Sequence, residues 1–322
     1  MKKASKYYLP ITLSLALLVA TACAPAAPSA PATPPAAPPA QQAPEAPDAD
    51  VEEEPEAPPA QMANPNVLID VHQLQEMIGQ DNVVVVDMSE RSNNVITGAI
   101  WIDRSRFYHN VDSGRMTIQP PEVVAQILGE HGIGNDTTVV IYCDDSNLWA
   151  VRFLWVLRSY GHEDIRILDG GTSAWRAAGG STARGAGQPG SATTFIPNTD
   201  YFESKRATLD DVIRAKNNPD QYTILDVRSP SEWRGGRIPG AVQFTYPDDI
   251  VNRDGTFRTV EEYEALLAHI SRDTSIIVYC LGGVRSSNMY FVLVDFLGWP
   301  NPVMNYDGSW WNYEASGEPI ER

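Results

Sequence analysis

Short, uninterrupted runs of apolar residues alternate along most of this chain with stretches of helical periodicity. We expect the apolar runs to be strands buried on both faces of a sheet: residues 83–86, 139–142, 165–168, 223–227, 275–279 and 302–305. Helical patterns are found at residues 122–128, 150–159, 209–216, 260–270 and 286–297. This alternation predicts an α/β fold with parallel sheets covered by helices on both faces.

An internal repeat divides these elements into two groups. Tyr142-Cys143 recurs as Tyr279-Cys280, and other short motifs recur at the same separation along the chain. A repeat this long indicates two duplicated domains. We place them at residues 64–182 and 205–322. Residues 183–204 begin with a stretch rich in Gly, Ala, Ser, Thr and Pro, so we expect them to form a linker between the domains.

The beginning of the chain has the pattern of an export signal at residues 1–22. Lys2, Lys3 and Lys6 precede a short apolar run and then small residues. The run is shorter than the roughly 20 residues that span a bilayer comfortably. Residues 19–23, Val-Ala-Thr-Ala-Cys, resemble the lipobox of bacterial lipoproteins, whose cysteine becomes the lipidated N-terminus. The resemblance implies an extracytoplasmic protein anchored to a membrane through Cys23. A cleaved signal without lipidation and an uncleaved anchor are the alternatives.

Residues 23–63 are rich in proline and alanine and carry acidic but no basic side chains. Such a segment cannot bury enough apolar surface to offset the entropy of ordering it. We expect an extended linker that holds the globular part away from the membrane.

Composition narrows the classes of function. The 322 residues include 41 acidic and 24 basic side chains, for a net charge of −17, which argues against a nucleic-acid partner. Only 3 cysteines are present, which excludes a disulfide scaffold and a four-thiolate zinc site. We expect a monomer that needs no metal and no organic cofactor.

Cys280 directly follows a predicted strand, at the edge of a parallel sheet where ligands gather. The next residues are Leu281, Gly282, Gly283, Val284 and Arg285, and a helix pattern follows. Glycines let backbone N–H groups turn inward as an anion-binding nest, to which the helix N-terminus and an arginine add positive charge. These features favour a thiolate nucleophile with a pKa below the usual 8.5 or so. A buried structural cysteine is the alternative reading.

The motif around Cys280 resembles the active-site loop of the rhodaneses, in particular of bacterial two-domain thiosulfate sulfurtransferases. Residues 226–241 resemble a second signature of that family, although histidine is commoner there at the position of Arg237. Residues 161–175 are similar to the family's non-catalytic N-terminal domain. The resemblance spans nearly all of residues 66–315. It implies two rhodanese-like domains and sulfur transfer from thiosulfate, through a persulfide on Cys280, to cyanide or a thiol.

The identity of the sulfur donor stays open within this resemblance. Arg285 and Arg228 favour a compact dianion such as thiosulfate, and with the backbone of residues 281–284 they are the expected binding residues. Thiosulfate-using relatives often carry a basic residue just after the cysteine, where this chain has Leu281 and Gly282. A 3-mercaptopyruvate sulfurtransferase and a persulfide carrier without efficient turnover are therefore alternatives.

Four residues separate Cys280 from Arg285. Similar phosphatases and arsenate reductases have five, which gives a loop large enough for a tetrahedral oxyanion. The shorter loop favours sulfur transfer over these two alternatives.

Cys143 occupies the equivalent position in the first domain, but its loop has Asp144 and Asp145 and neither glycine nor arginine. Negative charge raises a thiol pKa and repels anionic donors, so we expect Cys143 to be non-catalytic. For the carboxylates of the second domain we expect structural roles. Asp226 would orient an arginine as an acceptor, and Glu232 would pair with Arg237 or Arg228.

Overall fold

The computed structural model describes residues 60–91, 93–111, 114–144 and 146–322. The predicted signal, the lipidation site at Cys23 and all of the acidic linker before residue 60 lie outside this part. In the described ranges, no helix has both the length and the apolar character that a bilayer span requires.

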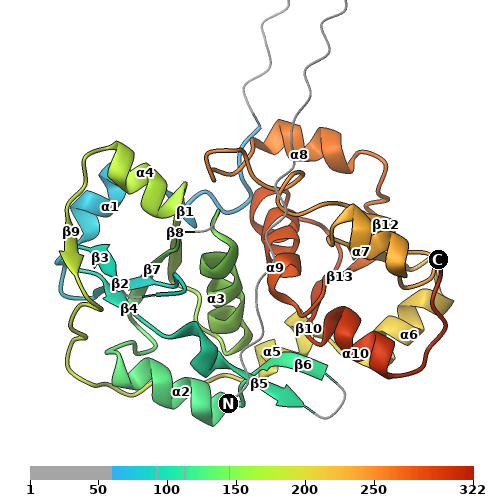
Figure 1. Cartoon of the computed structure of the whole chain (residues 1–322), viewed down its shortest axis with the longest axis horizontal. Coiled ribbons are helices and arrows are strands. Elements are labelled where there is room, and N and C mark those ends of the chain that lie inside the picture. Colours follow the sequence, from blue (N-terminus) through green and yellow to red (C-terminus); the bar gives the residue numbers. More distant parts are fainter. Residues whose placement is uncertain (1–59, 92, 112–113, 145) are drawn as a thin grey trace, which may run out of the picture. The chain divides into compact units, whose positions relative to one another are not determined.

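Two sheets of parallel strands form the centre of the fold, which confirms the predicted α/β class (Figure 1). The first has the order β1 (Leu68–Ile69), β8 (Ile165–Leu168), β7 (Thr138–Tyr142), β2 (Val83–Asp87) and β4 (Ile100–Trp101). The second repeats this order as β10 (Arg206–Ala207), β14 (Val303–Tyr306), β13 (Ser275–Tyr279), β11 (Tyr222–Asp226) and β12 (Val242–Gln243). The internal repeat in the sequence therefore corresponds to two sheets with the same strand order.

Helices connect these strands. The first domain has α1 (Val71–Met77), α2 (Pro121–Glu130), α3 (Leu148–Ser159) and α4 (Gly171–Ala177). The second has α5 (Asp200–Lys205), α6 (Leu209–Asn217), α7 (Pro230–Gly235), α8 (Val260–Leu267), α9 (Val284–Phe291) and α10 (Ser309–Ala315). A π-helical turn, Val292–Phe296, continues α9. The predicted helix at residues 286–297 is therefore two pieces, and it begins two residues earlier than expected.

Short antiparallel pairs complete the first domain. They join β3 (Asn94–Ile96) to β9 (Thr182–Arg184), and β5 (Tyr108–Val111) to β6 (Gly114–Ile118). The segment 183–204, predicted as the linker, contains the end of β9 and most of α5.

Both faces of each sheet are buried, which explains the uninterrupted apolar runs. In β13, Ile276 and Val278 contribute to one hydrophobic cluster, whereas Ile277 and Tyr279 contribute to another on the opposite face. Residues of α8 and α9 belong to the first cluster, and residues of α6 and α10 to the second. The prediction of helices on both faces is confirmed.

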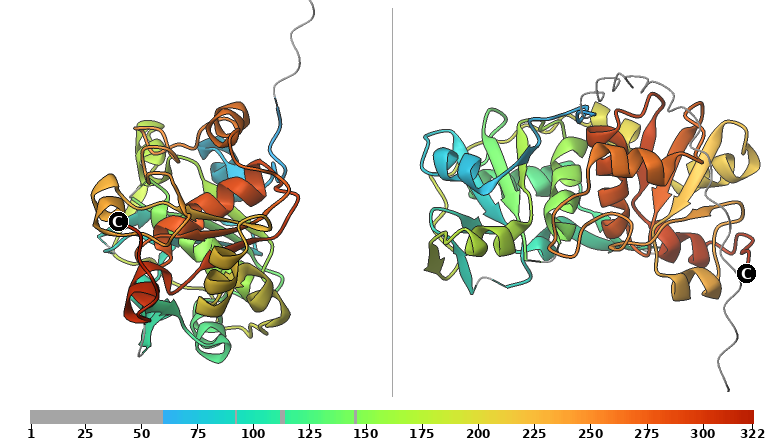
Figure 2. Two further views of the ribbon diagram at one scale, coloured as in Figure 1. Left: turned by 90° about the vertical axis from the view of Figure 1, so that its right-hand side faces the viewer. Right: turned by 90° about the horizontal axis from the view of Figure 1, so that it is seen from above.

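The two domains share one hydrophobic cluster, centred on α3 and α9, which lie side by side (Figures 1 and 2). Helix α3 is buried from Ala150 to Ser159, including two arginines. One of them, Arg158, donates two hydrogen bonds of 2.7 and 2.8 Å to Asp295 of the second domain. Both side chains are almost completely buried, so the ion pair is shielded from water.

Replacement of Arg158 by methionine should leave the Asp295 charge buried without its main partner. We expect a loss of about 3–5 kcal/mol in the free energy of unfolding, measured by urea denaturation, because an uncompensated buried charge is costly. Arg106→Met removes the exposed pair with Glu130 and should change stability little. Equal effects of the two substitutions would contradict this account of the domain interface.

Candidate active site

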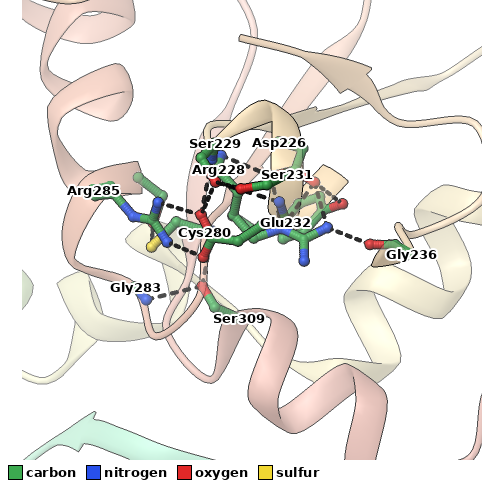
Figure 3. A network of polar contacts seen from close by, with 12 residues as sticks. Asp226, Arg228, Ser229, Ser231, Glu232, Gly236, Cys280, Gly283, Arg285 and Ser309 are labelled. Atoms are coloured by element: carbon green, nitrogen blue, oxygen red, sulfur yellow. Dashed lines mark hydrogen bonds and ion pairs between the residues drawn. The ribbon is translucent and has the colours of Figure 1, made fainter. Parts of the chain in front are cut away.

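The candidate site forms where three neighbouring strands of the second sheet end. Cys280 follows β13, Asp226 ends β11, and Asn305 lies in β14 on the other side. Because the strands are parallel, their carboxyl ends meet at one edge of the sheet. The loops after β11 and β13 and the start of α10 come together there (Figure 3).

Residues 280–285, here called the cysteine loop, include two glycines at positions where a side chain would collide with the surrounding protein. Gly283 has a φ of +79°, and a Cβ atom there would lie 2.7 Å from the carbonyl oxygen of Asp307. A Cβ atom on Gly282 would lie 2.6 Å from the ring of Trp311. The loop therefore packs against the β14–α10 connection with no space for larger residues.

Ser309, the first residue of α10, fixes the backbone of the cysteine loop. The sequence did not reveal this role. Its Oγ atom accepts hydrogen bonds from the backbone N–H groups of Cys280, at 3.1 Å, and Gly283, at 2.9 Å. It donates in turn to the carbonyl oxygen of Tyr306. Ser309 is completely buried and has a left-handed φ of +50°, which is unusual for a residue with a side chain. Both ends of the glycine turn thus depend on one hydroxyl group.

Cys280 is 1% exposed, and burial by itself would raise the pKa of its thiol. Burial is the largest single effect on this group. The charge of Arg285, the backbone N–H groups of Ser286 and Gly282 and the Ser286 hydroxyl act in the opposite direction and together outweigh it. The pKa of Cys280 is therefore below its ordinary value, and the site favours a thiolate.

The Ser286 hydroxyl lies 3.6 Å from the Cys280 sulfur and 2.6 Å from Oδ1 of Asn305. Asn305 also donates, from Nδ2, to the carbonyl oxygen of Gly283. Ser286 and Asn305 thus tie the start of α9 to β14 beside the sulfur. Neither was recognised from the sequence, in which they are ordinary polar residues.

Arg285 is oriented by a carboxylate on α7. Its two terminal nitrogens donate to the two carboxylate oxygens of Glu232, both at 2.8 Å. Hydrogen bonds from Arg285 and Ser229 lower the pKa of Glu232 to about 2, against the effect of burial. Glu232 therefore stays ionised and keeps Arg285 beside Cys280. The expectation that Glu232 pairs with Arg237 or Arg228 was wrong, since its partner is Arg285.

Arg228 is 1% exposed and contacts groups of the protein itself. It donates to both carboxylate oxygens of Asp226 and to the carbonyl oxygen of Gly236, and its guanidinium lies 4.2 Å from the ring centre of Trp310. The interpretation of Asp226 as an orienting acceptor is confirmed. Contact of Arg228 with a sulfur donor stays a prediction.

The backbone N–H groups of the cysteine loop and of Ser286, which follows it, point in two directions. Gly282 and Ser286 direct their N–H groups to the sulfur, whereas Gly283 directs its N–H to Ser309. The carbonyl oxygen of Leu281 accepts from Trp311, and Val284 is the first residue of α9. The structure thus brings all six predicted loop residues together, but the N–H group of Gly283 has a partner within the protein.

Residues 70–178 and 208–316 each match the family model of the rhodanese-like domain. The chain belongs to the rhodanese family. It is 32% identical over 271 residues to a thiosulfate sulfurtransferase of Corynebacterium glutamicum, covering 78% of this chain and 88% of the relative. It is 34% identical over 285 residues to the sulfur carrier protein TtuD of Thermus thermophilus, covering 81% and 98%. The similarity to both relatives extends through the two domains.

Solved structures show the same fold at lower identity. An anaerobic ergothioneine biosynthesis enzyme from Chlorobium limicola, in complex with trimethyl histidine, superposes with a TM-score of 0.70 at 23% identity, covering 80% of this chain and 71% of the enzyme. YnjE superposes with a TM-score of 0.66 at 22% identity, covering 79% and 68%. At these identities the similarity concerns the fold alone.

In the first rhodanese domain, Cys143 occupies the position equivalent to Cys280 and is equally buried. Asp144 follows it and is exposed, and α3 begins at Leu148 without an arginine at its start. Where the second domain has Arg228, the first has Ser89, whose N–H donates to Asp87. The described part of this loop therefore has none of the positive side chains that accompany Cys280. Asp145 lies outside the described residues.

Replacing Arg285 with methionine should raise the pKa of Cys280, because the charge that most strongly opposes the effect of burial is then lost. Peptide-resolved mass spectrometry can follow iodoacetamide alkylation of Cys280 as a function of pH. The midpoint should move upward in Arg285→Met and stay closer to that of the wild type in Arg285→Lys. Arg237→Met, which removes a surface pair with Glu321, serves as the control. An unchanged midpoint in Arg285→Met would show that Arg285 does not stabilise the thiolate.

Proposed function

We propose that this rhodanese-family sulfurtransferase takes sulfur from thiosulfate and carries it as a persulfide on Cys280. The observation that carries the proposal is the set of donors around the sulfur. A buried thiol is surrounded by Arg285, two backbone N–H groups and the Ser286 hydroxyl, which together lower its pKa. A low-pKa thiolate is the form of cysteine that attacks sulfur.

The transfer is a substitution at sulfur. The Cys280 thiolate attacks the outer sulfur of thiosulfate, the sulfur–sulfur bond of thiosulfate breaks, and its electron pair leaves with sulfite. The enzyme keeps a persulfide with one negative charge. The donors that stabilise the thiolate are placed to stabilise this anion too. A nucleophilic acceptor, cyanide in an assay or a thiol, then removes the outer sulfur and regenerates the thiolate in a ping-pong cycle.

The choice of thiosulfate as the donor is supported by the positive charge near Cys280 and by the relative from Corynebacterium, which is named as a thiosulfate sulfurtransferase. Arg285 engages Glu232 with both of its terminal nitrogens. We therefore assign it first to the thiolate and the persulfide, and secondarily to the sulfonate oxygens of the donor. 3-Mercaptopyruvate is the competing donor, and turnover with the two compounds should be compared directly.

A second candidate function is a persulfide carrier that hands its sulfur to a partner protein. The relative named as a sulfur carrier protein supports this candidate, at an identity as high as that of the sulfurtransferase. A carrier would load sulfur stably from thiosulfate but would turn over slowly with small acceptors. The four-residue spacing between Cys280 and Arg285 favours either of these functions over phosphatase or arsenate reductase chemistry.

A thiosulfate:cyanide assay on the full chain tests the proposal. Cys280→Ser should reduce thiocyanate formation by roughly a thousandfold or more, since the nucleophile is lost. Cys143→Ser is the matched control and should keep most of the activity. A Cys280→Ser protein with substantial activity would refute the mechanism. A folded but inactive Cys143→Ser protein would refute the assignment of the first domain as non-catalytic.

We also propose that the protein is exported and anchored through a lipid on Cys23, on the support of the lipobox-like residues 19–23. In a bacterial host, a lipidated product should partition into the detergent phase and incorporate labelled fatty acid. Cys23→Ala should abolish the label and release the protein from the membrane fraction. Incorporation of label by Cys23→Ala would contradict this site.

A further inference from the structure

Arg152, a residue of the first domain, reaches into the backbone of the cysteine loop. It lies on α3, its side chain is completely buried, and its Nη1 atom donates a 3.0 Å hydrogen bond to the carbonyl oxygen of Gly283. Its Nη2 atom donates to the carboxylate of Asp307, also in the second domain. The guanidinium lies 4.5 Å from the ring centre of Trp155 and 5.3 Å from that of Tyr108. This one side chain therefore joins the first domain to two segments of the active site.

The partners of Arg152 are fixed as firmly as Arg152 itself. Asp307 is completely buried, and its other carboxylate oxygen accepts the N–H of Ile118 from the first domain. The fork of the guanidinium group lets one arginine bind a carboxylate and a carbonyl at once. Because a buried arginine needs such compensation, Arg152 holds its position only when the second domain is in place.

Arg152 contacts a glycine of the cysteine loop, a residue whose backbone has wide conformational freedom. Gly283 has positive φ and no side chain, so the protein around it must restrict its conformation. Its N–H is held by Ser309 of its own domain, and its carbonyl oxygen is held by Arg152 together with Asn305 and Ser287. The N–H of Gly283 is thus held from its own domain, and its carbonyl oxygen is held from both domains.

The orientation of Gly283 determines where the neighbouring donors point. In a trans peptide unit, C=O and N–H point in opposite directions. The Gly283 carbonyl faces Arg152, so the N–H of Val284 faces away from it, and as the first residue of α9 it has no helical partner. The two N–H groups that reach the sulfur, of Gly282 and Ser286, flank this segment. A rotation at Gly283 would displace them.

We propose that Arg152 is a positioning residue of the sulfur-transfer site, through which the first domain fixes the cysteine loop of the second. The inference rests on the proposed function for its role in turnover, but it concerns the thiolate itself and can be tested without a sulfur donor. It gives the first rhodanese domain an indirect part in the chemistry of the second, through the backbone of the cysteine loop.

The test measures the pH midpoint of Cys280 alkylation by iodoacetamide, with peptide-resolved mass spectrometry on the full chain. Arg152→Lys keeps the charge but replaces the fork with a single ammonium group. Arg152→Met combined with Asp307→Asn removes both charges together, so that neither is left buried alone. Arg285, whose charge acts on Cys280, and Glu232, which pairs with Arg285, are unchanged in these variants.

Arg158→Met is the matched control, because Arg158 lies on the same helix and pairs across the same interface but does not touch the cysteine loop. We expect the midpoint to rise by about one pH unit in both Arg152 variants, because the N–H groups directed at the sulfur are then less well positioned. At pH values well below the wild-type midpoint, alkylation would then be about tenfold slower. Arg158→Met should keep the wild-type midpoint although its thermal unfolding temperature falls.

Two results would overturn the proposal: a wild-type midpoint in folded Arg152→Lys and in the double variant, or an equal shift in Arg158→Met. The second would indicate a general effect of the interface. If the wild type shows no sulfur transfer from thiosulfate but the midpoint still depends on Arg152, the proposed function fails and the positioning role stands.

Discussion

A buried thiolate must be stabilised by the protein because water does not reach it, and this constraint governs the second domain. Cys280 is almost fully buried, which alone would keep its thiol neutral. Arg285 and the N–H groups of Gly282 and Ser286 stabilise the thiolate, and they can do so only if the backbone is held in one conformation. The glycine turn, the left-handed Ser309 below it and the carboxylate of Glu232 behind Arg285 all serve that requirement.

The two domains have sheets of the same topology, but only the loop after Cys280 carries an arginine; residues 144 and 146–149, the described part of the loop after Cys143, contain no basic residue. In the first domain, the surroundings of Cys143 include Asp144 and Ser89 instead. What this domain supplies is a buried surface. Helix α3 packs along α9 and carries Arg152 to the carbonyl oxygen of Gly283. We therefore propose that the second domain performs the sulfur chemistry and that the first supports the loop on which it takes place.

Features encoded locally could be predicted from the sequence. Apolar runs predicted the strands because both sheet faces are buried, and Cys280 with its glycines was recognised because a strand, a turn and a helix follow one another directly. The role of Ser309 was missed, and Glu232 was assigned to the wrong arginine. Both contacts join segments that only tertiary structure brings together. One signal was overlooked. Arg152 and Arg158 stand in a helical stretch that is otherwise almost entirely apolar, and a buried arginine requires an acidic partner elsewhere.

Localisation of the transferred sulfur tests the central claim most directly. After treatment with thiosulfate and removal of the excess, intact-mass and peptide analysis should find one additional sulfur atom, on the peptide that contains Cys280. Cys143→Ser should load in the same way, and cyanide should remove the added mass. Sulfur bound to Cys143, or an unmodified Cys280 in a correctly folded protein, would contradict the account.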